Sequence, residues 1–303
     1  MPLETLVAEP VDPRVTAMAE ALAARYPDAA RSVLFYGSCL REANLDGLML
    51  DFYLIVSDYR AAYGPGWLAF ANRRVPPNVF PFEHDGLIAK YAVLSQDDFV
   101  RLASSATRNV SVWARFAQPS RLVWAADEGA ATHAVLAIAG AAPALLSAAR
   151  PLLADRVGVA ELWEGAFALT YGAELRAERK GRASSVVAAD PDRYARFTAP
   201  ALAAAGLGAA IESGIVNFAA TIASTERNAA EAAWRRRRRE GKALTLLRLA
   251  KASTTYAGGI DYLAWKINRH AGAAIEIKPW QRRWPILGAL ALLPRLVLRG
   301  AVR

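Results

Sequence analysis

Two strongly apolar runs separated by a short polar stretch restrict this chain to folds that contain a buried sheet. Residues 33–37 read VLFYG and residues 48–56 read LMLDFYLIV. Short apolar runs of this composition, bounded by glycine or polar residues, are typical of buried strands. Residues 87–94 (LIAKYAVL) and 120–125 (SRLVWA) predict two further strands.

Helical spacing of apolar residues alternates with these strands. It predicts helices over residues 13–30, 96–106 and 108–117. Strands interleaved with helices are typical of layered folds in which helices cover a sheet. The pattern therefore predicts a sheet-containing domain of the α/β or α+β class that spans residues 13–128.

From about residue 130 alanine becomes frequent, and helical patterns replace strand patterns. They predict helices over residues 130–150, 160–180, 200–232 and 242–271. The polar segment 180–197 predicts a loop or a small β-ribbon. We thus expect an α+β protein in which a mixed-sheet domain precedes a mainly helical domain over residues 129–271.

Composition narrows the class of protein. Hydrophobic residues make up 54% of the 303 residues and charged residues 21%, which supplies a large core and excludes a mainly disordered chain. A single cysteine, Cys39, excludes an intrachain disulfide and suits a reducing compartment. Because the chain has only this cysteine and three histidines, we expect no structural zinc site. The first residues are acidic and carry no apolar run, so we expect no secretory signal.

The net charge of +9 is distributed unevenly along the chain. From Arg235 to the end there are 16 basic and 3 acidic residues, whereas the preceding 234 residues carry 21 basic and 25 acidic ones. The basic character thus belongs to the C-terminal quarter. Such asymmetry indicates a polyanionic partner at that end, either nucleic acid or anionic lipid.

Residues 279–303 form a distinct tail of tryptophans, arginines and leucines. The apolar stretch 285–298 has 14 residues and carries Pro294, so it is too short to span a bilayer. Arginines recur every fourth residue from Arg295 to Arg303, on one helical stripe. Two interpretations fit, an ordinary terminal helix packed on the body or an amphipathic helix lying in a membrane interface, and we favour the second.

The region between the first two predicted strands carries a candidate phosphate site. Gly37 and Ser38 follow the first strand. Because glycine has no Cβ, a turn of this kind at the start of a helix can bring backbone N–H groups close to phosphate oxygens. Strand alternation places the apolar residues 50, 52, 54 and 56 on one face and leaves Asp51 and Tyr53 on the other. A carboxylate in so apolar a strand needs a partner or a metal, and Mg²⁺ over a triphosphate would satisfy it.

This arrangement resembles the DNA polymerase β-type nucleotidyltransferase superfamily, in which a Gly-Ser turn precedes a strand with the pattern acid-x-acid. Here Tyr53 takes the place of the second acid. If two metal ions bind, the other carboxylate comes from elsewhere. Four acids stay open as candidates for it: Asp46, Asp58, Glu83 and Asp85.

A closer resemblance, over about residues 33–260, is to the mitochondrial-type CDP-diacylglycerol synthases, the translocator assembly and maintenance protein family. That family has the Gly-Ser turn and a Met-Leu-Asp-Phe strand without a second acid. Its motifs have counterparts here in the same order: MLDFYLIVSD (49–58), AKYAVLS (89–95), VWARFAQPSRLVW (112–124), LTYGAELR (169–176) and LRLAKASTTYAGGI (247–260). The chain departs from the family at Ala117 and at Ala257, where a lysine is missing, and Arg248 or Lys251 are candidates to replace it.

The resemblance implies a phosphatidate cytidylyltransferase, which converts CTP and phosphatidic acid to CDP-diacylglycerol and pyrophosphate with Mg²⁺ or another divalent cation. It implies that Gly37 and Ser38 cradle the β- and γ-phosphates and that Asp51 is the metal ligand. A lipid phosphate is already ionised at neutral pH, so no general base is needed. Positioning and charge neutralisation then carry the catalysis.

Three further residues have more than one interpretation. Lys90 and Arg115 are predicted to contact the triphosphate or the lipid phosphate, and the alternative is that they are surface charges. Tyr53 either lines the nucleotide pocket or packs against a neighbour. A catalytic role for Cys39 is not expected, because no histidine motif supports a thiolate nucleophile.

The lipid substrate implies a protein on the cytoplasmic side, peripheral on the inner face of the membrane, with an anionic membrane surface as partner and no nucleic acid. The basic run 234–239 (WRRRRR) and the tail are two weak membrane signals that together can anchor such an enzyme. Two alternatives stay open. One is a nucleotidyltransferase acting on RNA, a protein or a small metabolite, and the other is a non-catalytic basic module that binds membranes or nucleic acid.

Overall fold

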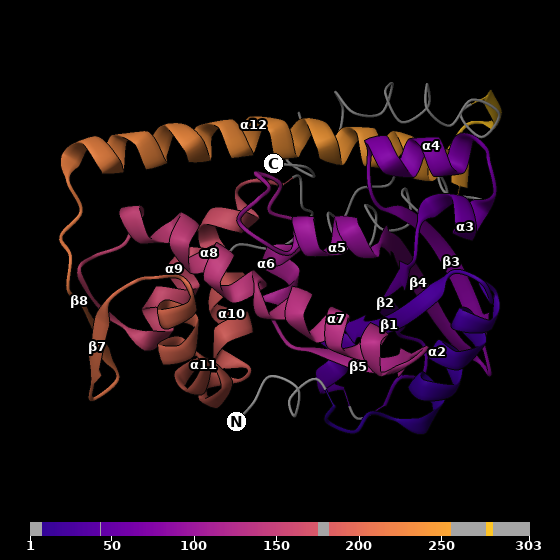
Figure 1. Cartoon of the computed structure of the whole chain (residues 1–303), viewed down its shortest axis with the longest axis horizontal. Helices are drawn as coiled ribbons and strands as arrows, with labels where there is room; N and C mark the ends of the chain where they lie inside the picture. Colours follow the sequence, from indigo (N-terminus) through magenta and orange to yellow (C-terminus); the bar gives the residue numbers. More distant parts are fainter. Residues whose placement is uncertain (1–7, 43, 175–181, 256–276, 281–303) are drawn as a thin grey trace.

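The computed structural model describes residues 8–42, 44–174, 182–255 and 277–280 (Figure 1). The strands are β1 (Ala30–Tyr36), β2 (Met49–Val56), β3 (Asn78–His84), β4 (Leu87–Ser95), β5 (Ser120–Ala125), β6 (Arg156–Gly158), β7 (Ala209–Glu212) and β8 (Ile215–Phe218). The helices are α2 (Pro13–Ala24), α3 (Tyr59–Tyr63), α4 (Trp67–Arg74), α5 (Gln96–Leu102), α6 (Trp113–Phe116), α7 (Glu128–Ala139), α8 (Ala141–Ala149), α9 (Val159–Tyr171), α10 (Arg182–Ala188), α11 (Pro191–Ala204) and α12 (Ser224–Thr255). Two short 3₁₀ turns are η1 (Ser38–Arg41) and η2 (Arg150–Leu152).

A five-stranded mixed sheet forms the first part of the chain, in the order β3-β4-β2-β1-β5. β2 and β4 are parallel, and the other neighbours are antiparallel. Mainly helical structure follows it. The predicted α+β class, a mixed sheet followed by a mainly helical region, is confirmed.

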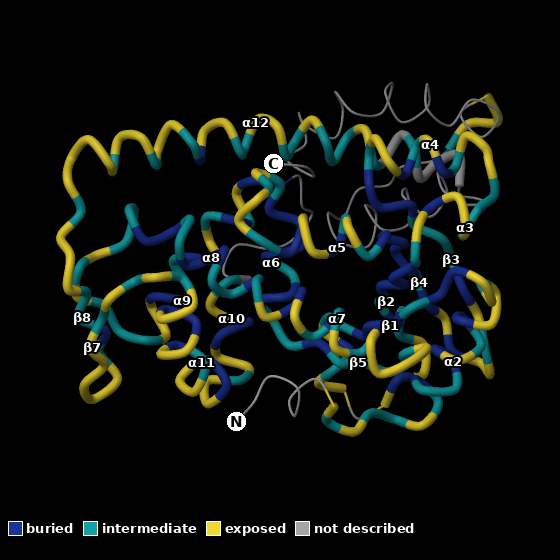
Figure 2. Tube along the Cα trace, in the orientation of Figure 1, coloured by how far each residue is buried: buried dark blue, intermediate teal, exposed yellow. Residues whose placement is uncertain are grey.

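Each face of this sheet is covered by a separate hydrophobic cluster. The apolar residues 50, 52, 54 and 56 of β2 pack with α2, whose Val15, Met18 and Leu22 are fully buried. Tyr53 and Ile55, on the other face, pack with α5, α6 and the helices that follow. The predicted alternation along β2 is therefore confirmed, and the strands of the sheet are mostly dark blue in Figure 2.

The second cluster continues without a break from the sheet into the helices of the second half. It joins Tyr53 on β2 to Trp163 on α9 and Trp234 on α12. The predicted domain boundary, between residues 128 and 129, falls in the first turn of α7, a helix that contributes to this shared core. The candidate site described below is therefore fixed by elements from both halves of the chain.

Two sequence predictions of secondary structure are wrong, and one strand was missed. The strand β3 was not predicted because Pro81 interrupts its pattern, and proline is tolerated there because β3 is an edge strand. Residues 180–197 contain helices α10 and α11 instead of a β-ribbon. The helix predicted over 200–232 is replaced by the β7–β8 hairpin, whose turn residues Ser213 and Gly214 both have positive φ, as such tight turns require.

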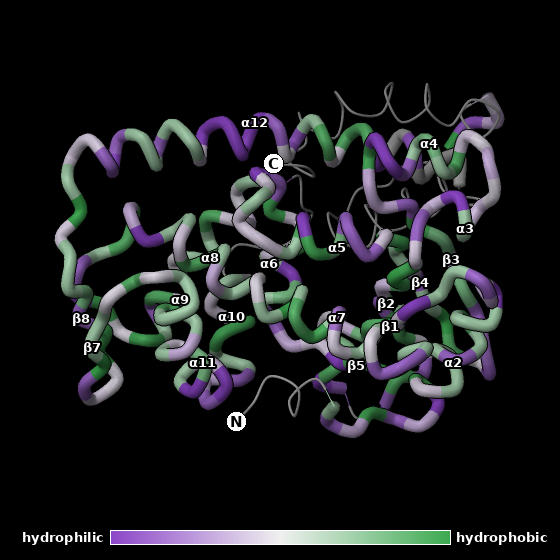
Figure 3. Tube along the Cα trace, viewed as in Figure 1, coloured by the Kyte–Doolittle hydropathy of each residue, from purple (hydrophilic) through white to green (hydrophobic). Residues whose placement is uncertain are grey.

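The long helix α12 has 32 residues and runs across both parts of the molecule (Figure 1). Its middle carries the basic run, purple in Figure 3. Trp234 at the start of that run is fully buried, and its indole Nε1 donates to the carbonyl of Ala148 at 2.9 Å. The tryptophan thus anchors the helix, whereas Arg235, Arg236 and Arg239 beside it are exposed. Of the predicted tail 279–303, all but residues 279 and 280 lie outside the described residues.

One helical stretch in the described part of the chain, Glu128–Leu152, is long and apolar enough to cross a membrane by length and composition. It comprises α7, α8 and η2. Core helices of globular proteins pass the same criterion, and in this chain Ala134, Leu145 and Leu146 of that stretch belong to the shared core.

Candidate active site

The turn after β1 has the geometry that its glycine was predicted to provide. Gly37 has φ 97° and ψ −164°, a conformation that residues with a Cβ rarely adopt. A Cβ at this position would lie 3.2 Å from Oδ2 of Asp51. Glycine therefore leaves the space beside that carboxylate open. The helix that follows, η1, is a single 3₁₀ turn of four residues, and Ser38 at its start is exposed.

Asp51 and Lys90 form the central ion pair of the candidate site. They lie opposite each other on the parallel strands β2 and β4, so their side chains project from the same face. Lys90 Nζ lies 2.5 Å from Asp51 Oδ1, with 26% and 22% of the two side chains exposed. Asp51, half-buried in an apolar strand, thus has the cationic partner that its position requires, and Lys90 is no isolated surface charge.

Arg115 approaches the same face from α6. Its Nη1 donates to the hydroxyl of Tyr53 at 3.1 Å, and its guanidinium lies 5.2 Å from the centre of the Tyr36 ring. Burial by itself lowers the pKa of Arg115, but the charges of Tyr36, Tyr53 and nearby acids outweigh it, so the pKa is raised and the cation is retained. Arg115 is therefore a positioned cation.

Tyr53 packs against neighbours. Only 1% of its surface is exposed, and its ring centre lies 5.2 Å from those of both Tyr36 and Phe116. Of the two interpretations left open for Tyr53, packing describes its ring. Its hydroxyl is the group that holds Arg115 in place. The prediction that Tyr53 also contacts nucleotide stays a prediction.

Two further charged residues belong to this region: Arg248, a candidate from the sequence for the missing lysine, and Glu174, which was not assigned a role. Arg248 on α12 donates to the carbonyl of Pro76 at 2.8 Å and to Ser111 Oγ at 2.6 Å. Glu174 is 9% exposed, and its charge acts on both Arg115 and Arg248. Burial and the neighbouring Arg115 lower the pKa of Arg248. Both residues lie in stretches that resemble family motifs, which is the signal that could have found Glu174.

The described residues contain no group of three or more histidine, cysteine or acidic side chains that could hold a metal ion. The four candidates for a second carboxylate lie elsewhere: Asp46 pairs with Arg14, Asp58 caps α3, Asp85 lies beside His84 in a turn, and Glu83 is exposed on β3. Mg²⁺ is commonly held by one or two carboxylates together with substrate phosphates. Asp51, with the open space at Gly37 beside its Oδ2, fits the one-carboxylate form of such a site.

Cys39 lies close to this pair but does not have the character of a nucleophile. Its side chain is 7% exposed, and its Sγ lies 3.5 Å from the carbonyl of Met49. Burial and the adjacent Asp51 carboxylate raise the pKa of the thiol, which Lys90 only partly offsets. The thiol is thus neutral near pH 7, as the absence of a supporting histidine motif predicts.

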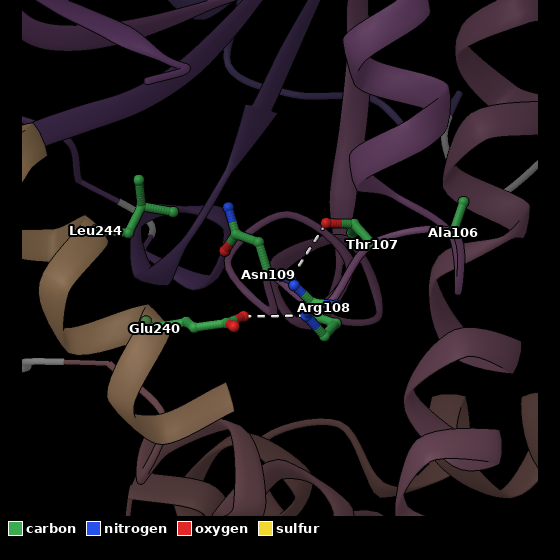
Figure 4. A pocket seen from close by; sticks show the side chains of 7 residues that line it. Ala106, Thr107, Arg108, Asn109, Glu240 and Leu244 are labelled. Carbon is green, nitrogen blue, oxygen red and sulfur yellow. Dashed lines mark hydrogen bonds and ion pairs between the residues drawn. The ribbon is translucent and has the colours of Figure 1, made fainter. Parts of the chain in front are cut away.

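Two hollows adjoin α12. One, of about 350 Å³, lies between the loop 106–109 and α12, where Arg108 Nε pairs with Glu240 Oε2 at 3.0 Å (Figure 4). The other, of about 500 Å³, is lined by four cations at helical spacing: Arg235, Arg238, Arg239 and Lys242. Arg235 pairs with Glu231, and the other three form no ion pair within the described part of the chain. These cations belong to the basic quarter of the chain, and the anionic partner that the charge asymmetry predicts there stays a prediction.

Comparison with known proteins identifies no family. No family model matches the chain, and no curated protein sequence matches it. Among solved structures, the chain is similar to a nucleotidyltransferase-like protein from Exiguobacterium sibiricum 255-15. The sequence identity is 11%, the TM-score is 0.28, and the match covers 95% of this chain and 91% of that one.

Proposed function

We propose that this chain is a nucleotidyltransferase that transfers a cytidylyl group from CTP to phosphatidic acid at a membrane surface. The observation that carries the proposal is the Asp51–Lys90 ion pair, set on parallel strands beside a glycine that leaves one carboxylate oxygen accessible. A carboxylate, a lysine and a close-approach glycine turn are the elements that nucleotide phosphates need. The family resemblance supports the lipid acceptor.

In the proposed reaction, an oxygen of the phosphatidate phosphate attacks the α-phosphorus of CTP. A new P–O bond forms, the bond from the α-phosphorus to the oxygen bridging to the β-phosphorus breaks, and pyrophosphate leaves with that electron pair. The attacking oxygen is already ionised, so no residue must remove a proton. This requirement agrees with a site in which the positioned groups are the cations Lys90 and Arg115 beside the Asp51 carboxylate.

The residues of the chain then act by positioning and by charge. Lys90 and Arg115 would hold phosphate oxygens and stabilise negative charge as it grows on the leaving group. Gly37 would let the triphosphate approach the backbone closely, and Ser38 would donate its exposed hydroxyl. Asp51 would hold Mg²⁺, which when bound neutralises part of the triphosphate charge.

The test is transfer of label from α-labelled CTP, with Mg²⁺ and phosphatidic acid in mixed micelles, into the lipid phase. We expect lipid-soluble label with the wild-type protein and none above background with Asp51→Asn. Asp28→Asn is the matched control, because Asp28 is an exposed carboxylate at the opposite end of β1 from Gly37. Wild-type protein that binds CTP but labels no lipid would refute the acceptor, and label lost equally in both variants would refute the role of Asp51.

A second acceptor, RNA, is favoured by one observation, the cationic hollow on α12. Four cations along about two turns of helix suit the repeating phosphates of a nucleic acid as well as those of lipid headgroups. Adding RNA in place of lipid to the same assay separates the two. Label that enters RNA, and that is lost in an Arg238→Gln/Arg239→Gln variant, would assign the acceptor to RNA.

A further inference from the structure

Helix α4 presents two large aromatic side chains to solvent. Trp67 is 54% exposed and Phe70 63% exposed, and they lie three residues apart, on one side of the helix. The opposite side buries Ala69 and Asn72. Isolated exposed apolar residues are common, but an adjacent Trp and Phe on one short helix form a contiguous apolar patch.

The patch is held rigidly against the sheet. Asn72 Nδ2 donates to the carbonyl of Val93 on β4 at 2.9 Å, and Asn78 Nδ2 donates to the carbonyl of Leu68 at 3.3 Å. These bonds fix which side of α4 packs inward. The exposure of the two aromatic rings is therefore a consequence of the fold, since turning them inward would break both bonds.

The chain segment that carries this patch contains only positive charges. Between Asp58 and Glu83 the sequence contains three arginines and neither acids nor lysines. Arg60, Arg73 and Arg74 are all exposed, and none of them forms an ion pair within the described ranges. Aromatic side chains flanked by unpaired arginines suit a surface with an apolar interior and anionic headgroups.

We propose that the face formed by Trp67, Phe70, Arg73 and Arg74 docks the protein on an anionic phospholipid bilayer. The aromatic rings enter the headgroup–acyl boundary and the arginines contact lipid phosphates. A single-stranded nucleic acid is the other ligand that combines stacking with arginines. The bilayer fits better because the guanidinium of Arg74 lies 5.3 Å from the centre of the Phe70 ring, where a base would have to stack.

This docking face rests on the proposed function, because it assumes that the reaction takes place at a membrane. It also indicates a route by which the lipid headgroup would reach the candidate active site. At the end of α4, Lys251 donates to the carbonyl of Val75, and Arg248 donates to that of Pro76. Arg248 in turn lies close enough to Tyr53 and Arg115 for their charges to interact. Arg248 therefore links the end of α4 to the candidate active site.

The test is co-sedimentation of the full chain with vesicles of phosphatidylcholine, with and without phosphatidylglycerol. Trp67→Ser/Phe70→Ser should lower the partition coefficient on anionic vesicles about tenfold, because two apolar side chains no longer enter the interface. Arg73→Gln/Arg74→Gln should weaken binding to the anionic vesicles only. Leu136→Ser is the matched control, since Leu136 on α7 is 67% exposed, and it should bind as the wild type does.

Both rings are exposed, so the double serine variant leaves no internal cavity, and circular dichroism checks that it folds. Wild-type partitioning by that variant would overturn the proposal. So would self-association in the absence of lipid, or binding of a single-stranded RNA, that is lost in the same variant. Asp51→Asn should bind vesicles as the wild type does. Wild-type protein that binds vesicles but labels no lipid would refute the proposed function and leave the docking face standing.

Discussion

Gly241 on α12 is the position at which one added methyl group would have the largest effect on the candidate site. A Cβ there would lie 2.1 Å from the backbone oxygen of Ala173, one residue before Glu174. To reach even 3.0 Å, the two backbones must separate by about 0.9 Å. Because both partners are backbone, no side-chain rotation relieves the contact.

The effect of Gly241→Ala on the free energy of unfolding can be compared with that of a glycine-to-alanine substitution in another helix. Alanine gains about 1 kcal/mol over glycine in a helix interior, whereas overpacking costs about 1–3 kcal/mol. Because both partners are backbone, we expect the upper end of the overpacking cost, which leaves Gly241→Ala destabilised by about 2 kcal/mol, a fall of about 3 °C in melting temperature for a chain of this length. Gly165→Ala is the matched control, because its Cβ would meet only Cδ2 of Leu153, the end of a flexible side chain, at 2.8 Å.

Calorimetry should therefore show a lower melting temperature for Gly241→Ala and an unchanged or higher one for Gly165→Ala. In Gly241→Ala the displaced helix should also move Arg248 relative to Arg115, so nucleotide transfer should fall while the protein remains folded. A Gly241→Ala protein as stable as Gly165→Ala would refute the close approach of α12 to residue 173.

Three other perturbations test the site. Gly37→Ala should weaken CTP binding in titration calorimetry because its Cβ meets Asp51, whereas Gly47→Ala, which also has positive φ but no atom within 4 Å, should bind normally; equal losses would contradict this. Lys90→Gln should lower kcat about a hundredfold, since a cation at the phosphates is removed, and an unchanged kcat would exclude it from the reaction. Burial and Arg248 lower the pKa of Lys251 to about 7, whereas in the unfolded chain this pKa is about 10.5. Between these pH values the unfolded state binds more protons than the folded state. The free energy of unfolding should therefore rise with pH across that range. Urea midpoints at about pH 6 and about pH 9.5 should show this gain in the wild type and not in Lys251→Met.

Much of the sheet could be predicted from the sequence because its strands have local signals. The runs at β1, β2, β4 and β5 are short and apolar, and period-two alternation along β2 assigned Asp51 and Tyr53 to one face. The β7–β8 hairpin was missed because alanine-rich sequence around it favours helix, while its turn depends on positive φ at two residues. Local propensity does not include the pairing between strands that turns of this kind bring about.

The candidate site divides in the same way. Gly37 and Asp51 were identified from the sequence, since a glycine turn and a carboxylate in an apolar strand are local patterns. The partner of Asp51 was not, because strand register places Lys90 opposite it from 39 positions away in the chain. Nor was the anchor of Arg115, because the hydroxyl of Tyr53 is brought to it by packing between β2 and α6.

By itself, then, the sequence determined the buried strands, the helical second half and the concentration of basic residues after Arg235, because each depends on composition or on short-range periodicity. Only the tertiary structure decided that α12 crosses both parts, that Trp234 is buried while the arginines around it line a hollow, and that α4 holds Trp67 and Phe70 outward. These features arise from contacts between residues distant in the chain, and the free energy of such contacts is decided only when the whole core is assembled.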